Sequence, residues 1–199
     1  MKDLLLLAFL ISIFSCTNGE YQSPINPDPS ITPETASAEA TALPYSEDAS
    51  LQLSSLINAE NQMIDQGLLN NGRKHGAWLN YTDTYNRQNL NTVYNYIDGT
   101  KHGPYLIMDN GASLKETGTY YEGQLHGTRT VFARGKIVET VNFQKGQLHG
   151  LTTRFYDDGK TKKEEGNYLN GKRDGIHKWF DQEGQVIIEY TYKDGEQVK

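Results

Sequence analysis

A short segment bracketed by two glycines returns five times between residues 72 and 175 of this chain. Its leading glycines are 27, 24, 23 and 25 residues apart, and Gly195 follows 24 residues after the last of them. A period of this length constrains the fold strongly, because every copy must form the same supersecondary unit. The loop residues to which we assign a structural role are Gly72, His75, Gly76, Gly99, His102, Gly103, Gly123, His126, Gly127, Gly146, His149, Gly150, Gly171, Asp174 and Gly175.

Large apolar side chains mark a strand before each segment. The ninth position before the leading glycine is apolar in five of six copies, from Met63 to Val186. We expect it to share one strand face with the third position, because side chains alternate along a strand. The third position holds Leu69, Tyr96, Tyr120, Phe143, Tyr168 and Tyr192.

A second strand is predicted after each segment. The fifth position after the second glycine is apolar or aromatic in all five copies, from Tyr81 to Phe180. In four copies a tight-turn signal follows, and we expect a wider loop over 86–91 in the first copy. The fold predicted is all-β, an elongated single-layer antiparallel sheet of stacked hairpins. The four predicted turns are Asn110-Gly111, Arg134-Gly135, Asp158-Gly159 and Glu183-Gly184.

The unit of about 23 residues resembles the MORN repeat, with a tyrosine, the glycine-bracketed loop, an aromatic residue and a closing glycine. It is more similar to the bacterial MORN-variant repeat of YwqK-family antitoxins. Tyr120 to Gly135 and Tyr96 to Gly111 carry the resemblance best, and it covers residues from about 63 to 199. The aromatic residue after the second glycine is present as Trp78 and Tyr105, whereas later copies have Arg129, Thr152 and His177.

The N-terminus resembles a bacterial lipoprotein signal. Residues 4–14 are apolar except Ser12, too few to span a bilayer but enough for a signal-peptide core. Cys16 is the only cysteine, and the resemblance implies that it carries the lipid anchor. The alternative is an ordinary signal peptide that contains a cysteine. Localisation is predicted as the bacterial cell envelope, at the outer membrane or cell surface rather than the inner membrane.

Three segments are predicted: a signal peptide over 1–15, a disordered acidic tether over 16–50 and the repeat domain over 51–199. Five of the six prolines lie in the tether, without hydrophobic periodicity. Eight acidic residues and no Lys or Arg occur between Asp3 and Arg73, whereas 18 basic and 16 acidic residues follow from Arg73 onward. The nearly neutral repeats argue against nucleic-acid binding. We interpret residues 51–71, in which Met63 to Leu69 match the incoming strand, as a degenerate half-repeat that caps the N-terminal edge, with a short helix over 51–63 as the alternative.

Catalytic and metal sites are not indicated. Equivalent loop histidines lie two strands apart, roughly 9–10 Å, so neighbours cannot share one zinc ion. We expect them to hydrogen-bond the loop instead. Glu116, Glu139 and Glu164 recur at one offset and are interpreted as repeat structure. No enzyme activity, metal or cofactor is predicted.

A single-layer sheet leaves side chains on two faces, and several aromatic residues lie off the main rows. The function predicted is a lipid-anchored scaffold that binds an unidentified protein partner. The alternatives are an antitoxin-like or immunity protein and a glycan- or lipid-binding module, and a small-molecule ligand is not expected. The candidate partner-binding residues are Tyr94, Tyr105, Tyr121, Tyr156, Trp179 and Tyr190.

Overall fold

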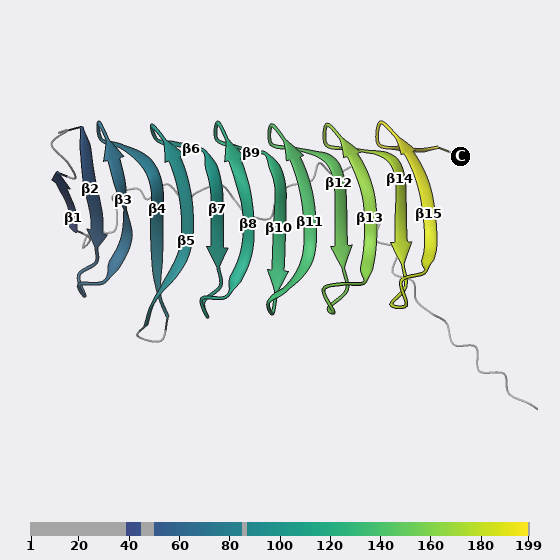
Figure 1. Cartoon of the computed structure of the whole chain (residues 1–199), viewed down its shortest axis with the longest axis horizontal. Helices are drawn as coiled ribbons and strands as arrows, with labels where there is room; N and C mark the ends of the chain where they lie inside the picture. Colours follow the sequence, from purple (N-terminus) through teal and green to yellow (C-terminus); the bar gives the residue numbers. More distant parts are fainter. Residues whose placement is uncertain (1–38, 45–49, 85–86, 199) are drawn as a thin grey trace, which may run out of the picture.

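The computed structural model describes residues 39–44, 50–84 and 87–198, and these form one open antiparallel sheet of 16 strands (Figure 1). The all-β prediction is confirmed. In the described ranges, no helix is long and apolar enough to cross a membrane. The predicted signal peptide, Cys16 and most of the predicted tether lie outside the described residues.

The strands follow one another along the chain in hairpin order, and each pairs with its neighbours in sequence. Two very short strands, β6 and β9, lie off the main path and pair with β5 and β8. The strands are β1 (Glu39–Pro44), β2 (Leu51–Ile57), β3 (Met63–Asn70), β4 (Arg73–Thr84), β5 (Arg87–Ile97), β6 (Thr100–Lys101), β7 (Gly103–Met108), β8 (Leu114–Tyr121), β9 (Gln124–Leu125), β10 (Gly127–Ala133), β11 (Lys136–Gln144), β12 (Gln147–Phe155), β13 (Lys162–Leu169), β14 (Lys172–Phe180), β15 (Val186–Lys193) and β16 (Glu196–Val198).

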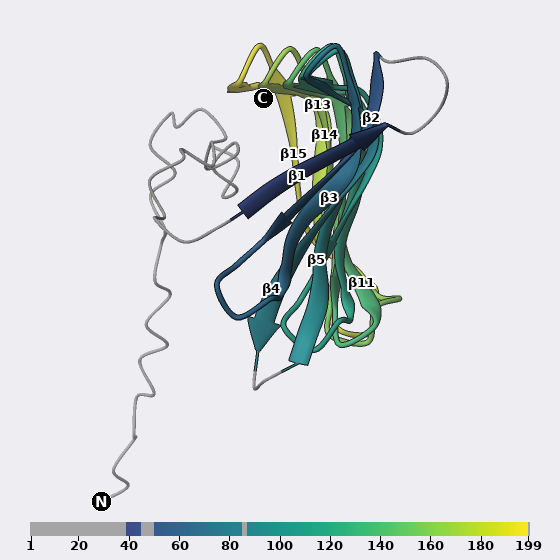
Figure 2. The ribbon, with the colours of Figure 1, turned by 90° about the vertical axis from the view of Figure 1, so that its left-hand side faces the viewer.

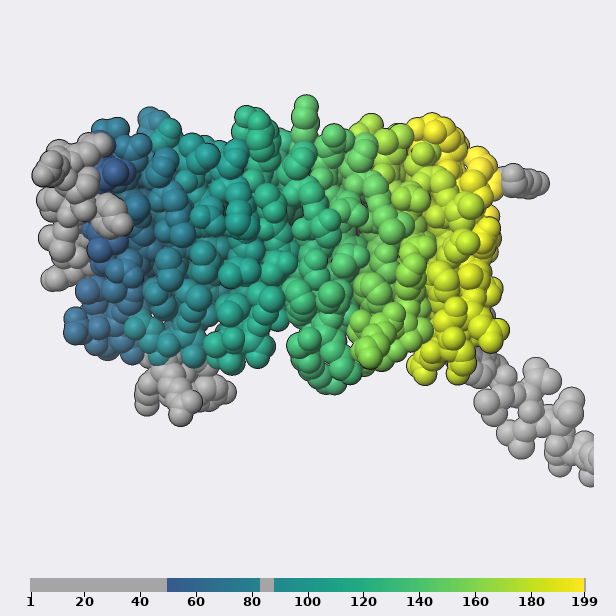
Figure 3. All heavy atoms as spheres, viewed as in Figure 1, coloured from purple at the N-terminus to yellow at the C-terminus, as the bar shows by residue number. Residues whose placement is uncertain are grey.

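The sheet is a single curved layer, as the view along its long axis shows (Figure 2). Successive units stack side by side along that axis without gaps (Figure 3). From Gly99 onward, each unit also bonds to the previous one through its leading glycine. For example, the N–H of Gly123 donates to the carbonyl oxygen of Lys101 at 2.8 Å, and that of Gly146 to Leu125 at 2.9 Å. The hydrogen bonds between successive loops therefore recur at the same position of each unit.

The glycine-bracketed loops begin with two-residue hairpin turns, as at Asn71 (φ 49°) and Gly72 (φ 74°). Two consecutive positive φ values are typical of the type I′ turn, whose twist matches that of the strands. All ten bracketing glycines of the five copies have positive φ, the backbone conformation that a role in the turn would use. The positive φ explains why glycine is required at these positions.

The turns at the other end of the hairpins differ from the prediction. Only Arg134-Gly135 is a tight turn in which both residues have positive φ, 52° and 74°. In the turn around Asn110-Gly111, Ala112 has the positive φ (59°), because the Asp109 carboxylate accepts the N–H groups of Gly111 and Ser113 and widens the turn. The predicted wider loop over 86–91 is wrong, since β4 and β5 continue their pairing to Thr84 and Arg87.

A β-bulge in each hairpin corrects the prediction that the third and ninth positions share a face. Ile107 pairs with Glu116, but the next residue, Met108, pairs with Leu114. The extra residue, Lys115, turns Leu114 to the face opposite Glu116. The same register shift occurs beside Phe132, Phe155 and Phe180.

The N-terminal end of the array begins earlier than predicted. Residues 51–57 form β2 and residues 63–70 form β3, as the half-repeat interpretation requires and the alternative helix does not. Strand β1 lies within the range predicted as a tether and pairs with β2 along its whole length. Its sequence, Glu-Ala-Thr-Ala-Leu-Pro, contains one large apolar residue, Leu43, and therefore gives little hydrophobic signal.

Candidate interaction surfaces

One face of the sheet contains its main buried row, and we call it the packed face. The row occupies the second position after each second glycine, where Trp78, Tyr105, Arg129 and His177 are all buried. Val141, Phe143 and Leu148 form a buried hydrophobic cluster, with Leu125 and Tyr168 packed against it. The other side of the sheet is called the opposite face.

Three side chains of the buried row lie over glycines of a neighbouring strand. A Cβ atom on Gly67 would approach the Trp78 ring to 2.5 Å, and one on Gly118 would approach Tyr105 to 2.7 Å. On Gly166 it would come within 2.0 Å of His177 Nδ1. These glycines are therefore required because a ring occupies the space above them.

Trp78 and His177 have the same role in their units. The Trp78 indole N–H donates to the carbonyl oxygen of Leu68, and His177 Nε2–H donates to that of Asn167, both at 2.8 Å. Both carbonyls lie four residues before a leading glycine, where the register of the hairpin shifts. His177 thus replaces the aromatic residue of the MORN pattern. Burial lowers the pKa of His177 and keeps it neutral.

A ladder of alternating charges crosses the packed face from β8 to β13. Arg129 lies 2.9 Å from Glu116 and 3.6 Å from Glu139, and Arg154 lies 2.9 Å from Glu139 and 3.1 Å from Glu164. The side chains of Glu116 and Arg129 are only 4% and 5% exposed, whereas Arg154 is 49% exposed. The recurring glutamates therefore have a structural role. The sequence analysis did not predict that Arg129 and Arg154 pair with these glutamates.

Cations cover the aromatic rows at both ends of the packed face. The ammonium group of Lys74 lies 4.2 Å from the Trp78 ring centroid, and that of Lys101 lies 3.9 Å from the Tyr94 ring. The Arg173 guanidinium lies 5.1 Å from the Tyr192 ring. In these cation–π contacts, the cationic side chains cover aromatic surface that would otherwise face solvent.

Three predicted partner-binding residues take part in packing contacts. Tyr94 and Tyr105 stack at a centroid distance of 5.5 Å. Tyr105 is only 2% exposed and donates to Glu116 Oε1 at 2.7 Å, so it belongs to the core and is not a contact residue. Burial and the neighbouring carboxylate raise its pKa. Tyr156 donates its hydroxyl to the carbonyl oxygen of Phe180 at 2.6 Å.

Trp179 and Tyr190 lie near the C-terminal end of the array. Their rings meet edge to face at 6.0 Å, and Tyr190 is 42% exposed. The structure therefore brings together Tyr94 with Tyr105, and Trp179 with Tyr190, as two separate pairs. The six predicted residues do not form one continuous site.

Tyr121 is the most exposed of the predicted residues, at 50%, and lies on the opposite face. Its ring stands between the imidazoles of His102 and His126, at 5.1 and 5.8 Å. The backbone N–H groups of these histidines bond back to Asn95 and Thr119, whereas their side chains contact the tyrosine. The expected role in loop hydrogen bonding is thus performed by the backbone. Within the described residues, no three His, Cys, Asp or Glu side chains are grouped to hold a metal ion.

The opposite face exposes apolar side chains along several successive units. They belong to β5, β7, β8, β12, β13 and β14, and each is between 38% and 50% exposed. Strand alternation and the pairing registers place them on one side of the sheet. We call this set the exposed apolar row: Ile97, Leu106, Tyr121, Leu151, Leu169 and Ile176.

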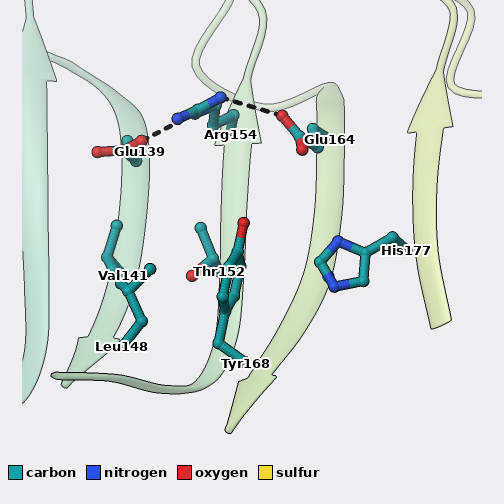
Figure 4. A pocket seen from close by; sticks show the side chains of 9 residues that line it. Glu139, Val141, Leu148, Thr152, Arg154, Glu164, Tyr168 and His177 are labelled. Carbon is teal, nitrogen blue, oxygen red and sulfur yellow. Dashed lines mark hydrogen bonds and ion pairs between the residues drawn. The ribbon is translucent and has the colours of Figure 1, made fainter. Parts of the chain in front are cut away.

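A depression lies on the packed face over strands β11 to β14 (Figure 4). Val141, Leu148 and the Tyr168 ring line its apolar side. Arg154 bridges Glu139 and Glu164 at its other side. Apolar surface and convergent polar groups are thus combined in one place.

Comparison with known proteins identifies the C-terminal units. Residues 148–170 and 173–194 match the MORN repeat variant family. Each match begins in an outgoing strand and ends one residue after the next incoming strand, so that it covers β12 with β13 and β14 with β15. The resemblance inferred from the sequence is confirmed for these two units.

No curated protein matches this chain. Among solved structures, a mutant of S. aureus TarM in complex with Fondaparinux, alpha-GlcNAc-glycerol and UDP is similar over 68% of this chain and 21% of that chain. The identity is 10% and the TM-score is 0.26, a similarity that supports no conclusion about fold or function.

Proposed function

We propose that this protein is an envelope-anchored lipoprotein whose repeat sheet is a scaffold for binding a protein partner. The exposed apolar row on the opposite face carries this proposal. Exposed apolar side chains gathered on one face of a protein can serve as an interaction surface. Repeat arrays present such rows on a stiff support, because each unit contacts only its neighbours.

The packed face is less suited to a protein partner. Its charges are paired in the ladder and its aromatic rows are covered by Lys74, Lys101 and Arg173. On the opposite face, Tyr121 offers an aromatic side chain beside two imidazoles, and Ile97 and Leu151 are further exposed apolar side chains of that face. Exposed aromatic residues frequently contribute most of the binding energy at protein interfaces.

A capture experiment tests the scaffold. The full-length protein in native membranes would be isolated with its bound partner, in parallel with a Tyr121→Ser, Leu151→Ser double variant. We expect the double variant to lose the partner and to keep its unfolding transition, because both side chains are exposed. The matched control is Thr119→Ser, at an exposed position of the same face. Retention of the partner by the double variant would contradict the proposal.

The anchor requires its own experiment. If the lipid is attached at Cys16, Cys16→Ser should release the protein from the membrane fraction and remove incorporation of a labelled fatty acid. If the wild type and the Cys16→Ser variant both stay membrane-bound and both lack the label, the lipoprotein assignment is wrong. The proposal of a protein-binding scaffold would not be affected by this result.

A further inference from the structure

Three Asn-Gly dipeptides lie in exposed turns of the sheet, at Asn71-Gly72, Asn110-Gly111 and Asn170-Gly171. A fourth, Asn18-Gly19, lies outside the described residues. An asparagine followed by glycine can lose its side-chain amide spontaneously, in water and without an enzyme. The three turns share this chemistry, but they differ in what holds the N–H group of the glycine.

Deamidation of such a dipeptide begins at the backbone nitrogen of the glycine. This nitrogen loses its proton and attacks Cγ of the asparagine, so that a C–N bond forms, the Cγ–Nδ2 bond breaks and ammonia leaves with the proton. A water molecule then opens the cyclic imide at either of its carbonyl groups, which leaves aspartate or isoaspartate. Glycine favours the attack because it has no Cβ that would shield the nitrogen.

In two of the turns the nitrogen that must react is already engaged in a hydrogen bond. The N–H of Gly171 donates to the carbonyl oxygen of Leu148 in the preceding unit, at 2.9 Å. The N–H of Gly111 donates to the carboxylate of Asp109, also at 2.9 Å. Each bond must break before the nitrogen can lose its proton and turn toward the side chain, so it slows the reaction.

The turn at Asn71-Gly72 lacks this protection. Its backbone matches that of the turn at Asn170-Gly171, with φ of 49° and 74° against 50° and 83°. In this first copy, however, the bond to the preceding segment lies one residue earlier, because the N–H of Asn71 donates to the carbonyl oxygen of Ser50 at 2.8 Å. The N–H of Gly72 has no hydrogen-bond partner among the described residues.

We propose that Asn71 is a site of spontaneous deamidation, and that in the folded protein it reacts faster than Asn110 and Asn170. Either product adds one negative charge to the first loop. Isoaspartate also lengthens the backbone of the two-residue turn by one carbon, which disturbs the pairing of Asn70 with Arg73 between β3 and β4. This modification is independent of the exposed apolar row.

The test follows all three sites in the full-length protein during incubation in neutral buffer. Peptide mass spectrometry with fragmentation localises each exchange of an amide for a carboxyl group and reports Asn18 separately. The same incubation in concentrated urea gives the rate of each site without the fold. Relative to urea, Asn71 should react about fivefold faster than Asn170, the effect of one hydrogen bond of ordinary strength.

A variant of the second turn tests the cause. Asp109→Ala removes the acceptor of the Gly111 N–H and should accelerate reaction at Asn110 about fivefold. Asp109→Asn keeps an oxygen acceptor and is the matched control, and neither change should affect Asn71. The proposal is overturned if Asn71 stays unmodified, if Asn110 or Asn170 reacts as fast relative to urea, or if Asp109→Ala leaves the rate at Asn110 unchanged.

Discussion

The imidazole of His177 lies directly over Gly166 and hydrogen-bonds the carbonyl oxygen of Asn167, the residue that follows this glycine. One ring thus packs on the neighbouring strand and satisfies a carbonyl at the register shift. Trp78 makes the same two contacts with Gly67 and Leu68. A ring packed over a glycine of the neighbouring strand therefore recurs in these units, and the ring can be an indole or an imidazole.

Replacing the glycine under the ring should destabilise the sheet. In Gly166→Ala the new methyl would lie 2.0 Å from His177 Nδ1, so the ring must move. We expect a loss of about 1–3 kcal/mol in the free energy of unfolding, measured by urea denaturation. Gly111→Ala is the matched control, because its nearest neighbour is the exposed Asp109 carboxylate at 3.3 Å. Equal losses in the two variants would argue against ring packing.

The two ends of the charge ladder should differ in their contribution to stability. Glu116→Ala leaves the Arg129 charge buried beside Glu139 and removes the Tyr105 hydrogen bond. Breaking a buried pair of this kind costs about 3–5 kcal/mol. Glu164→Ala affects the half-exposed Arg154 and should cost about 0–1 kcal/mol. Similar denaturation midpoints for both variants would show that burial does not determine how much each ion pair of the ladder contributes to stability.

Acid should destabilise the protein through His177. Its folded pKa is lowered by burial, so the unfolded state binds the proton more readily. The stabilising contribution is complete above the ordinary histidine pKa of about 6.5 and is lost as the pH falls below that value. The unfolding free energy of His177→Phe, measured over the same range, should depend less on pH. If the wild type and the variant change in parallel, this assignment is wrong.

The turn between β12 and β13 offers a separate titration. The Thr161 hydroxyl and the N–H groups of Lys160 and Thr161 bond to the Asp158 carboxylate and lower its pKa to about 2. In Thr161→Val the pKa should rise toward the ordinary value, because one of these bonds is lost. Carboxyl carbon chemical shifts followed by NMR would measure it, and an unchanged pKa would exclude the hydroxyl as the main cause.

The sequence was sufficient to predict the period, the antiparallel hairpins and the loop glycines. These features repeat, and each depends on local backbone geometry such as the positive φ of Gly72. The pairing of rings with glycines was only partly visible. Gly67, Gly118 and Gly166 share one position, but the identity of the partner ring depends on the register across strands.

The remaining features depend on contacts that the period does not reveal. Arg129 and Arg154 occupy different positions within their units, yet both reach Glu139. The exposure of Tyr121 and the burial of Tyr105 follow from strand alternation, since they lie on opposite faces. Strand β1 was missed because its few side chains show no clear hydrophobic pattern.

Site-specific photo-crosslinking in the source cells tests the scaffold most directly. A photoreactive amino acid would replace Tyr121 or Leu151 on the opposite face, and Asp157, an exposed turn residue, as the control. The account predicts one common protein adduct from both opposite-face positions and none from position 157. The absence of a shared adduct, or the same adduct at all three positions, would contradict a binding surface on the opposite face.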